Sequence, residues 1–201
     1  MAIINIIGTE IGDFLYGDAG GTYDTYAIFG GNGSDRIHGG DGNDRIYGEE
    51  GNDFLEGGYG SDTLSGGNGN DYLTGQNQFS NFLASPSDFE KDTLYGGGGA
   101  DIFFLHDISG NSSGLLPSPR IIPGSLLYAN DGDADYAIIK DFKSGEDKIQ
   151  LPGNASRYQL LSSGNSTRIY EDNGNFSEDE FIATVENTSG LSLDSSDFVF
   201  V

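Results

Sequence analysis

The sequence contains no cysteine, only nine basic residues and no long hydrophobic run. Without cysteine, neither disulfide bonds nor thiolate metal sites are available. No stretch approaches the roughly 18 apolar residues of a membrane-spanning helix, so we do not expect membrane insertion. The first eight residues, MAIINIIG, have no basic segment and too short an apolar run for a signal peptide. An exported chain would therefore have to carry its export signal elsewhere.

The charge of the chain is one-sided, because 32 acidic residues against nine basic ones give a formal net charge of −23 over 201 residues. Such an imbalance disfavours nucleic acid and anionic membrane surfaces as partners and favours multivalent cations. The 33 glycines and a hydrophobic content of 35% leave little apolar area to offset chain entropy. Composition alone is typical of a disordered chain, whereas regular repeats indicate a chain that folds once its charge is neutralised.

Five units of nine residues follow one another between Gly30 and Thr74. Each unit has glycine at its first and fourth positions, aspartate at its sixth and isoleucine or leucine at its eighth. A strict period with fixed chemistry at each position is typical of a solenoid. The end of each unit, such as Asp44 to Tyr47, alternates as a short strand with one buried face does. The glycine-rich start must turn the chain, which needs positive φ and close backbone approach. The units are GGNGSDRIH (30–38), GGDGNDRIY (39–47), GEEGNDFLE (48–56), GGYGSDTLS (57–65) and GGNGNDYLT (66–74).

Stacked turns of this kind bring aspartates eighteen residues apart into line. Asp35, Asp53 and Asp71 would form one column, and Asp44 and Asp62 another. Carboxylates about 4.8 Å apart repel each other without a counterion. Calcium accepts six to eight oxygen ligands in flexible geometry, whereas magnesium needs a smaller, more rigid octahedron. The pattern therefore predicts calcium between the turns. The alternative, a flexible glycine-rich linker with solvated acids, is disfavoured by five units in register.

These units resemble the RTX (repeats-in-toxin) or hemolysin-type calcium-binding repeats. The resemblance implies an all-β fold, a right-handed parallel β-roll with two units per coil, in which the first six residues of each unit bind several Ca²⁺ ions between coils. It also implies a core ladder of eighth-position residues: Ile37, Ile46, Leu55, Leu64 and Leu73. Similar units occur at GTEIGDFLY (8–16) and GGGGADIFF (96–104). The metal ligands expected from the resemblance are Asp13, Asp24, Gly30, Asn32, Asp35, Gly39, Asp41, Asp44, Gly48, Glu50, Asp53, Gly57, Tyr59, Asp62, Gly66, Asn68, Asp71, Asp92, Gly96, Gly98 and Asp101.

Two irregular insertions interrupt the period, at residues 17–29 and 75–91. Asp24 is the only plausible ligand in the first, and Asp92 follows the second, in which Ser80 is in phase with Asp62. Each insertion is either a bulge within a half-coil or a break in the roll. A bulge would stack Asp13 on Asp35 and Asp71 on Asp101. We favour the bulge, because Asp92 and Asp101 resume the nine-residue spacing.

Beyond the repeats, we expect three regions: the roll over residues 1–105, an irregular loop over 106–130 and a C-terminal β cap over 131–201. Residues 138–149 resemble the segment that closes RTX rolls in serralysin-type C-terminal domains, which implies that Asp141 and Asp147 are ligands or turn formers. The apolar stretches at 158–161, 167–170, 180–185 and the last five residues are expected to be antiparallel strands over the open end of the roll. The last five residues also resemble the uncleaved C-terminal signal of type I secretion substrates, which implies an ABC exporter as partner.

Catalytic motifs are weak in this chain. Residues 110–114 match G-x-S-x-G, but they have no strand-to-helix context, and both histidines precede them. Residues 131–142 begin like an EF-hand loop but lack its glycine and final glutamate, so at most they hold one extra calcium. His38 occupies an outward ninth position and is expected at the surface. We therefore expect a calcium-binding protein and no enzyme.

The sequence favours a secreted protein at the cell surface or in the extracellular matrix that folds on extracellular calcium. Self-association through the aromatic residues of the insertions is expected of such a structural component. The alternatives are a calcium-dependent binding module for a cell-surface glycan or a protein, and a stand-alone relative of the C-terminal domain of a secreted enzyme or toxin. The aromatic residues concerned are Tyr23, Tyr26, Phe29, Phe79 and Phe82.

Overall fold

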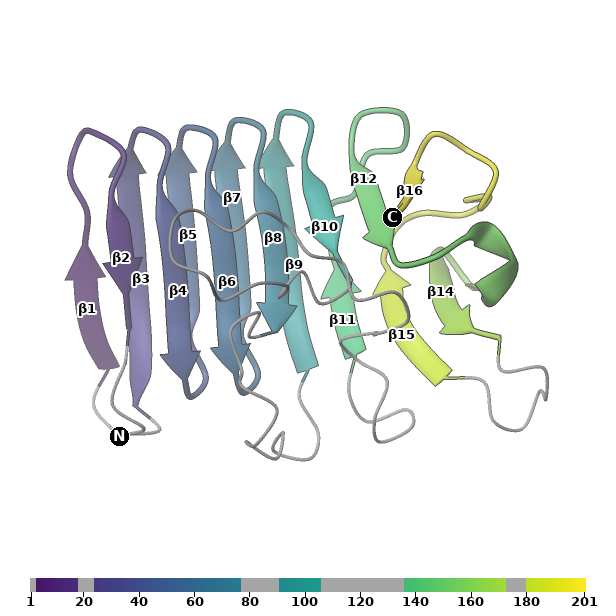
Figure 1. Ribbon diagram of the computed structural model, residues 1–201, viewed down its shortest axis with the longest axis horizontal. Coiled ribbons are helices and arrows are strands. Elements are labelled where there is room, and N and C mark those ends of the chain that lie inside the picture. The colour runs from purple at the N-terminus through teal and green to yellow at the C-terminus, as the bar shows by residue number, and fades with distance from the viewer. Residues whose placement is uncertain (1–2, 18–23, 77–90, 106–135, 173–179) are drawn as a thin grey trace.

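The computed structural model describes residues 3–17, 24–76, 91–105, 136–172 and 180–201 as two β-sheets that face each other, with the chain coiling from one to the other (Figure 1). The first sheet has nine strands in the order β1-β3-β5-β7-β9-β11-β15-β14-β13, and the second has seven in the order β16-β12-β10-β8-β6-β4-β2. This alternation is a parallel β-roll and confirms the fold expected from the repeats. The elements are β1 (Ile3–Ile7), β2 (Phe14–Tyr16), β3 (Thr25–Asn32), β4 (Arg36–Asp41), β5 (Arg45–Glu50), β6 (Phe54–Tyr59), β7 (Thr63–Asn68), β8 (Tyr72–Gln76), β9 (Lys91–Gly98), β10 (Ile102–Phe104), β11 (Tyr136–Ile139), β12 (Lys148–Leu151), the 3₁₀ turn η1 (Ala155–Arg157), β13 (Tyr158–Ser163), β14 (Ser166–Glu171), β15 (Glu180–Val185) and β16 (Phe198–Phe200).

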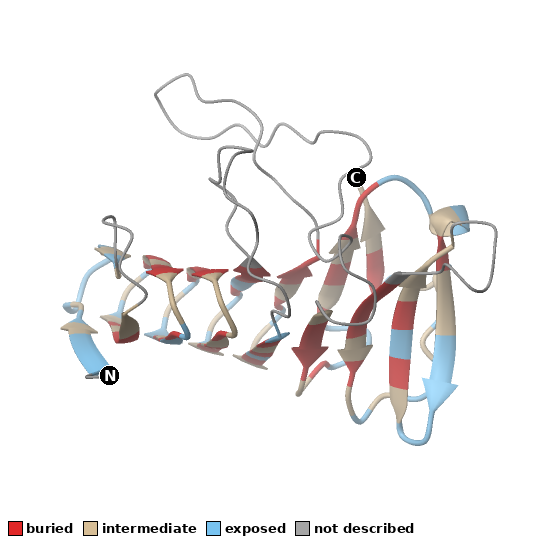
Figure 2. Ribbon diagram, turned by 90° about the horizontal axis from the view of Figure 1, so that it is seen from below, coloured by how far each residue is buried: buried red, intermediate tan, exposed pale blue. Residues whose placement is uncertain are grey.

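The core is a ladder of one aliphatic or aromatic side chain per half-coil. In the first sheet Ile28, Ile46 and Leu64 pair in parallel register, and in the second Ile37 pairs with Leu55. Figure 2 shows the buried residues on the strands of both sheets. The ladder predicted from the eighth positions is confirmed, because all of its members have zero exposure: Ile37, Ile46, Leu55, Leu64 and Leu73.

The glycines turn the chain because they adopt backbone angles that other residues avoid. In the unit that starts at Gly39, the second and fourth positions, Gly40 and Gly42, have φ of 104° and 121°. Only glycine adopts such angles without steric cost. The exception is Glu49, which occupies the second position of its unit with φ of 75°. A local strain of about 1–2 kcal/mol is expected there.

Both insertions leave the register of the roll intact. Leu64 pairs with Leu94 across 30 residues as Ile46 pairs with Leu64 across 18, and Leu15 pairs with Ile37 across 22. Each insertion is therefore a bulge between regular strands and not a break. The inserted residues Tyr23, Phe79, Ser80 and Phe82 lie outside the described part of the chain.

The roll continues further along the chain than the repeats do. β11 pairs in parallel with β9, and β12 with β10; β15 and β16 then add another parallel layer on β11 and β12. Antiparallel pairing joins β13 to β14 and β14 to β15, as expected for the cap. The expectation that the last strand is antiparallel is wrong, because β16 runs parallel to β12 and has Phe198 opposite Ile149. Parallel pairing needs only an extended segment with an inward apolar residue, which the chain end supplies without a repeat.

The connections between the sheets form two edges of the roll. At what we call the first edge, the chain passes from the first sheet to the second, as between β3 and β4 or between β5 and β6. At the second edge it returns to the first sheet. In Figure 1 the first edge runs along the top and the second along the bottom. Within the described part of the chain, no helix is long and apolar enough to cross a membrane.

Candidate metal centre

Aspartates stack in a column along the first edge, where each carboxylate accepts a hydrogen bond from the coil before it. The backbone N–H of Asp35 donates to Oδ1 of Asp53 at 2.8 Å, and that of Asp53 donates to Oδ1 of Asp71 at 2.8 Å. The column continues in both directions past the five central units. The further bonds run from the N–H of Asp13 to Asp35 (2.7 Å), from Asp71 to Asp101 (2.9 Å) and from Asp101 to Asp147 (3.0 Å).

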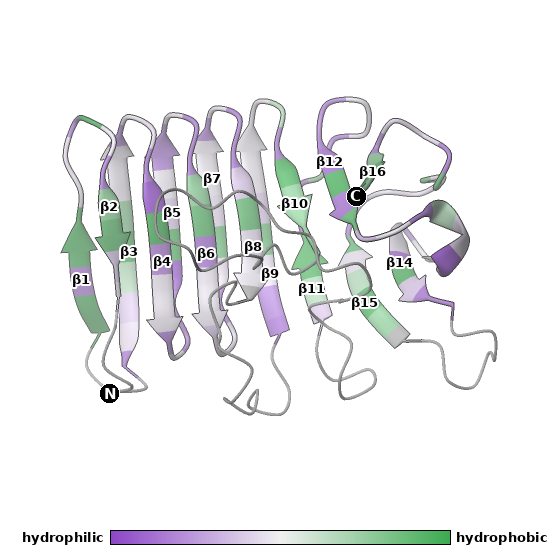
Figure 3. Cartoon of the chain, viewed as in Figure 1, coloured by the Kyte–Doolittle hydropathy of each residue, from purple (hydrophilic) through white to green (hydrophobic). Residues whose placement is uncertain are grey.

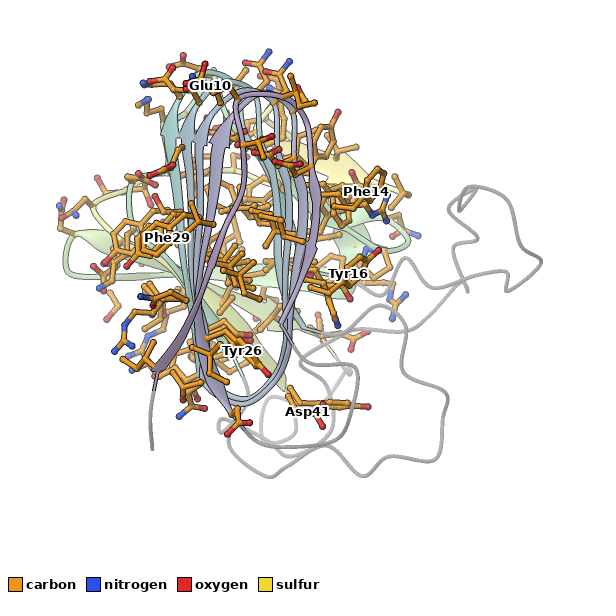
Figure 4. The ribbon with its side chains drawn as sticks, turned by 90° about the vertical axis from the view of Figure 1, so that its left-hand side faces the viewer. Glu10, Phe14, Tyr16, Tyr26, Phe29 and Asp41 are labelled. Carbon is orange, nitrogen blue, oxygen red and sulfur yellow. The ribbon has the colours of Figure 1, made fainter. Side chains whose placement is uncertain are left out.

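A second, shorter column follows the other edge. The N–H of Asp44 donates to Oδ1 of Asp62 at 2.7 Å, and that of Asp62 to Oδ1 of Asp92 at 2.9 Å. The residue in register before Asp44 is Tyr26, whose N–H donates to Asp44 at 2.8 Å. Tyr26, and not Asp24, therefore occupies the aspartate position there, inside the coil near its lower end in Figure 4. Beyond Asp92 the column ends, because Ala137 is next in register.

In five aspartates of the two columns, the second carboxylate oxygen has no hydrogen-bond partner in the described part of the chain. The side chains are 0–3% exposed, yet Oδ2 is buried and unpaired. An unpaired buried acceptor costs about 1–3 kcal/mol, and more when it is charged. Something positive must therefore offset that cost at neutral pH. The residues concerned are Asp35, Asp44, Asp53, Asp71 and Asp101.

Each unpaired oxygen faces a small space beside the first glycine of its own unit. A Cβ atom added to Gly30 would overlap Oδ2 of Asp35 and lie 2.6 Å from the carbonyl oxygen of Gly48 in the next coil. The same arrangement recurs at Gly66, between Asp71 and the carbonyl oxygen of Gly96 at 2.6 Å. Glycine is thus required at the first position because a carboxylate oxygen and a carbonyl oxygen converge there.

Burial changes the acid–base behaviour of both columns. It raises the pKa of Asp44, Asp53 and Asp101 to about 6 and that of Asp71 to about 7. The hydrogen bond from the preceding coil opposes each rise. The charges of Asp53 and Asp101 add to the rise at Asp71. Without a cation, the folded columns therefore hold protons that isolated aspartates would release.

The other expected ligands lie in rows along the two edges. The third-position side chains follow one another along the edges: Glu50 is in register with Asn32 and Asn68, and Asp41 with Tyr59. Their carbonyl groups are engaged, since those of Asn68 and Tyr59 accept from Gly51 and Gly42 at 2.8 Å. The remaining first-position glycines, Gly39, Gly48, Gly57 and Gly96, have the same closeness to their aspartates as Gly30. Whether each residue binds metal stays a prediction.

One ladder of hydrogen bonds between successive turns was not predicted from the sequence. Fifth-position side chains accept backbone N–H groups of the next coil on the same edge, as Asn52 does from Asn70 at 2.7 Å and Asn43 from Ser61 at 2.9 Å. The signal was present, because every fifth position from Ser34 to Asn70 is serine or asparagine. These bonds hold adjacent turns in register without using the aspartates.

His38 is less exposed than its outward position suggested. Its Nδ1 lies 3.4 Å from Oε1 of Glu56, and its ring meets Tyr16 edge-on, with 6.2 Å between ring centres. Only 16% of the His38 side chain and 2% of the Glu56 side chain is exposed. The expectation of a surface histidine is therefore wrong, because Glu56 and Tyr16 flank it in the next strands. The G-x-S-x-G match at 110–114 and the first five residues of the EF-hand-like stretch, 131–135, lie outside the described residues.

The donor set fits a hard divalent cation. Carboxylate and carbonyl oxygens are the ligands of Ca²⁺, and the described residues contain no group of three or more His, Cys, Asp or Glu side chains that could bind a metal. A site between two coils would thus combine one or two carboxylates with several backbone carbonyls. Calcium would neutralise the unpaired oxygens, whereas a thiol- or imidazole-preferring metal would find no ligands among them.

Comparison with known proteins gives one matching repeat model and one similar solved structure. The model of the RTX calcium-binding nonapeptide repeat, which describes four copies, matches at residues 28–55, 47–78 and 90–107. Curated protein sequences include no match. Among solved structures, the chain is similar to the AlgE6R3 subunit of the Azotobacter vinelandii mannuronan C5-epimerase, with 22% identity and a TM-score of 0.34 over 96% of this chain and 80% of that one. At this identity the likeness has no bearing on function.

Proposed function

Because this chain carries the calcium-binding repeats of the RTX family, we propose that it is a secreted, non-enzymatic structural protein that folds when it meets extracellular calcium. The observation that carries this proposal is the row of buried carboxylate oxygens along the first edge of the roll, those of Asp35, Asp53, Asp71 and Asp101, which have no hydrogen-bond partner among the described residues. In the cytosol, where calcium is scarce, the chain would remain an expanded polyanion suited to a type I ABC exporter. Outside the cell, calcium would neutralise the columns and allow the coils to stack.

The energetics support a folding switch that operates at millimolar calcium. Extracellular calcium modules bind with dissociation constants of about 10⁻⁴–10⁻³ M. At ten times its dissociation constant, calcium stabilises the folded state by about 1.4 kcal/mol per site. Several sites together are comparable to the whole stability of a small domain, which is about 5–15 kcal/mol. Removal of calcium would therefore unfold the roll and not merely loosen it.

Circular dichroism in calcium and in a chelator tests this proposal. We expect a β-sheet spectrum in calcium, a disordered spectrum in EDTA, and little recovery with magnesium. Asp53→Asn keeps the size of the side chain and the acceptor for the N–H of Asp35, so it should raise the calcium midpoint of folding. Asp194→Asn, at an exposed position, is the control of equal charge. An unchanged β spectrum in EDTA would contradict the proposal.

The N-terminal end of the roll supports self-association. Among the described strands, both sheets end there on strands with a neighbour on one side alone, β1 and β2, and β1 is strongly hydrophobic in Figure 3. An exposed apolar edge strand without charge or proline is a site for pairing with another chain. Most of the large apolar side chains exposed in the described part of the chain lie in this first coil: Ile3, Ile4, Ile7, Ile11, Phe14 and Tyr16.

A second copy of the chain fits this edge. The sequence of β1, Ile3-Ile4-Asn5-Ile6-Ile7, reads the same in both directions. A two-fold axis perpendicular to the sheet and midway between the two copies of Asn5 reverses the strand, so the pairing is antiparallel and places Ile4 opposite Ile6. Ile6 already packs against the core, so the apolar interior would continue from one copy into the other.

Analytical ultracentrifugation in calcium tests this assembly. Wild-type protein should dimerise, and Ile4→Lys should remain a monomer because the edge then carries a charge. Leu161→Lys is the matched control, since Leu161 is 51% exposed on β13 at the other end of the roll. A wild-type monomer would contradict the dimer. A dimer that Leu161→Lys breaks and Ile4→Lys does not would place the interface at the wrong end.

A further inference from the structure

At the first edge, the turn between β11 and β12 follows the last repeat. A carboxylate in this turn accepts backbone N–H groups of the repeat, as the carbonyl groups of a neighbouring strand would. β11 stops at Ile139, after which the N–H of Lys140 donates to the carbonyl oxygen of Leu94 at 3.0 Å. The Asp141 carboxylate then accepts from the last repeat: Gly96 N–H donates to Oδ1 at 2.9 Å and Gly97 N–H to Oδ2 at 3.1 Å. Without Asp141, a further strand would have to supply acceptors for these two N–H groups.

Two residues after Asp141, the positively charged side chain of Lys143 also contacts the last repeat. The Nζ of Lys143 donates to the carbonyl oxygen of Gly97 at 2.6 Å. The N–H of Lys143 donates to Oδ2 of Asp147 at 2.8 Å, and Oδ1 of Asp147 accepts the N–H of Asp101 at 3.0 Å. The ammonium group is thus held between the last repeat (residues 96–101) and the turn that follows it (residues 141–147), a space that we call the last interval. Burial raises the pKa of Asp101 to about 6, and the charge of Lys143 opposes that rise.

This interval differs from the earlier ones in its oxygen atoms. A Cβ on Gly30, Gly48 or Gly66 would meet both its own aspartate and the first-position carbonyl oxygen of the next coil. At Gly96 the three nearest atoms all belong to Asp101. The turn that follows contains one glycine, Gly145, and no glycine at the position that corresponds to Gly96. No carbonyl oxygen of the following turn lies closer than 3.0 Å to a Cβ on Gly96, and an ammonium group has been added.

We propose that Lys143 is a tethered cation that ends the calcium ladder, supplying between residues 96–101 and 141–147 the positive charge that calcium supplies between earlier coils. The inference rests on the proposed function, because it assumes that the earlier intervals bind calcium. Asp141 satisfies the N–H groups of the last repeat, Lys143 satisfies a carbonyl oxygen, and Phe142 closes the core against Phe103, with 6.1 Å between the rings. The coil formed by β11 and β12 therefore docks on the repeats without a metal ion.

Two variants of equal charge test this proposal in the full chain. Lys143→Met removes the ammonium group but keeps the length of the side chain. Lys148→Met is the control, because Lys148 pairs with Ile102 in the strand register and contacts the last repeat through its backbone N–H, which donates to the carbonyl oxygen of Asp101 at 2.8 Å and is kept in the variant. Calcium stoichiometry comes from equilibrium dialysis, and amide hydrogen exchange at Gly96 and Gly97 reports docking of the turn. Anomalous scattering from terbium-soaked crystals locates the bound ions.

In the wild type we expect terbium between the earlier coils and none between residues 96–101 and 141–147. In Lys143→Met we expect either one additional calcium per chain or exchange at Gly96 and Gly97 that is roughly ten- to a hundredfold faster, since a charged hydrogen bond is lost. A metal ion in this interval of the wild type would overturn the inference. So would a Lys143→Met protein that matches Lys148→Met in both measurements. If the wild type binds no calcium anywhere, the proposed function itself fails, which is a different result.

Discussion

Acid should stabilise the calcium-free protein, which is the reverse of the usual behaviour of aspartates. The pKa of Asp71 is about 7 in the folded chain against an ordinary value of 3.8, and that of Asp53 is about 6. Because the folded pKa is the higher one, the folded state holds the proton more tightly than the unfolded state. The resulting stabilisation is complete below about pH 4 and is lost as the pH rises through about 6 to 7.

The size of the effect follows from the number of aspartates in the columns. Each group changes the free energy of unfolding by up to about 1.4 kcal/mol per pH unit between its two pKa values. Four groups have a raised value of about 6 or 7: Asp44, Asp53, Asp71 and Asp101. Together they give up to roughly 5 kcal/mol per pH unit, and screening at the edges of the roll reduces this to about 2–3 kcal/mol.

Circular dichroism of protein dialysed free of calcium, from about pH 7.5 to about pH 4.5, measures the folded fraction, and urea unfolding at the acid pH values where the roll is folded measures this slope. We expect the folded fraction and the free energy of unfolding to rise as the pH falls. In saturating calcium the sign should reverse, because calcium favours the ionised carboxylates and protons compete with it. Calcium binding near pH 6 should accordingly release protons, which a weakly buffered titration detects.

Two variants separate the columns from the net charge of −23. Asp71→Asn keeps an acceptor for the N–H of Asp53 and removes one titrating group, so the calcium-free slope between about pH 5 and 7 should fall by about a quarter. Asp194→Asn changes the net charge equally at an exposed position and should leave the slope unchanged. A calcium-free stability that is constant or increases from pH 5 to 7 would refute the reasoning.

Two further predictions concern the backbone of the turns. Gly48→Ala should destabilise the calcium-bound protein by about 3 kcal/mol or more, because its Cβ would overlap the Asp53 carboxylate and lie 2.5 Å from the Gly66 carbonyl oxygen. Gly164→Ala, with φ of 63° and no atom within 4 Å, should cost only about 1 kcal/mol from backbone strain. Glu49→Gly should stabilise by about 0.5–1 kcal/mol, since it relieves the strain at φ of 75°. Urea midpoints in saturating calcium measure all three changes, and a destabilised Glu49→Gly would show that the glutamate side chain outweighs the strain.

The repeated part of the fold was predictable because each position of the nonapeptide has one physical role. The eighth position supplies the core, the glycines supply the turns, and the sixth supplies a carboxylate every eighteen residues. The phase of the columns was therefore accessible before the structure, including the pairs Asp13 with Asp35 and Asp71 with Asp101 across the insertions. Extra residues can be accommodated in a connection, whereas strand register is fixed by the apolar ladder.

The C-terminal coils were not predictable in the same way, because pairing continues where the motif stops. β11 and β15 have no glycine-rich start, yet Ile139 and Val185 pair with each other and are fully buried. Hydrogen bonding between parallel strands depends on the backbone, so a solenoid can continue on any segment of suitable length and pattern. Counting positions along the sequence pointed to Asp24 as the aspartate of the first insertion. The strand register shows instead that Tyr26 lies in line with Asp44.

The carboxylate column is longer along the first edge of the roll than along the second, and the length of the connecting turns explains the difference. A cation bound between two coils needs matching turns in both, because it takes oxygens from each. At the first edge the connections inside the repeats stay short, and the carboxylate column runs from Asp13 to Asp147. The long connections, β2 to β3, β8 to β9 and β10 to β11, all run from the second sheet to the first, and the column on that edge contains Asp44, Asp62 and Asp92 alone among the described residues. We therefore expect calcium to stabilise this roll mainly along its first edge, where the carboxylate column is longer.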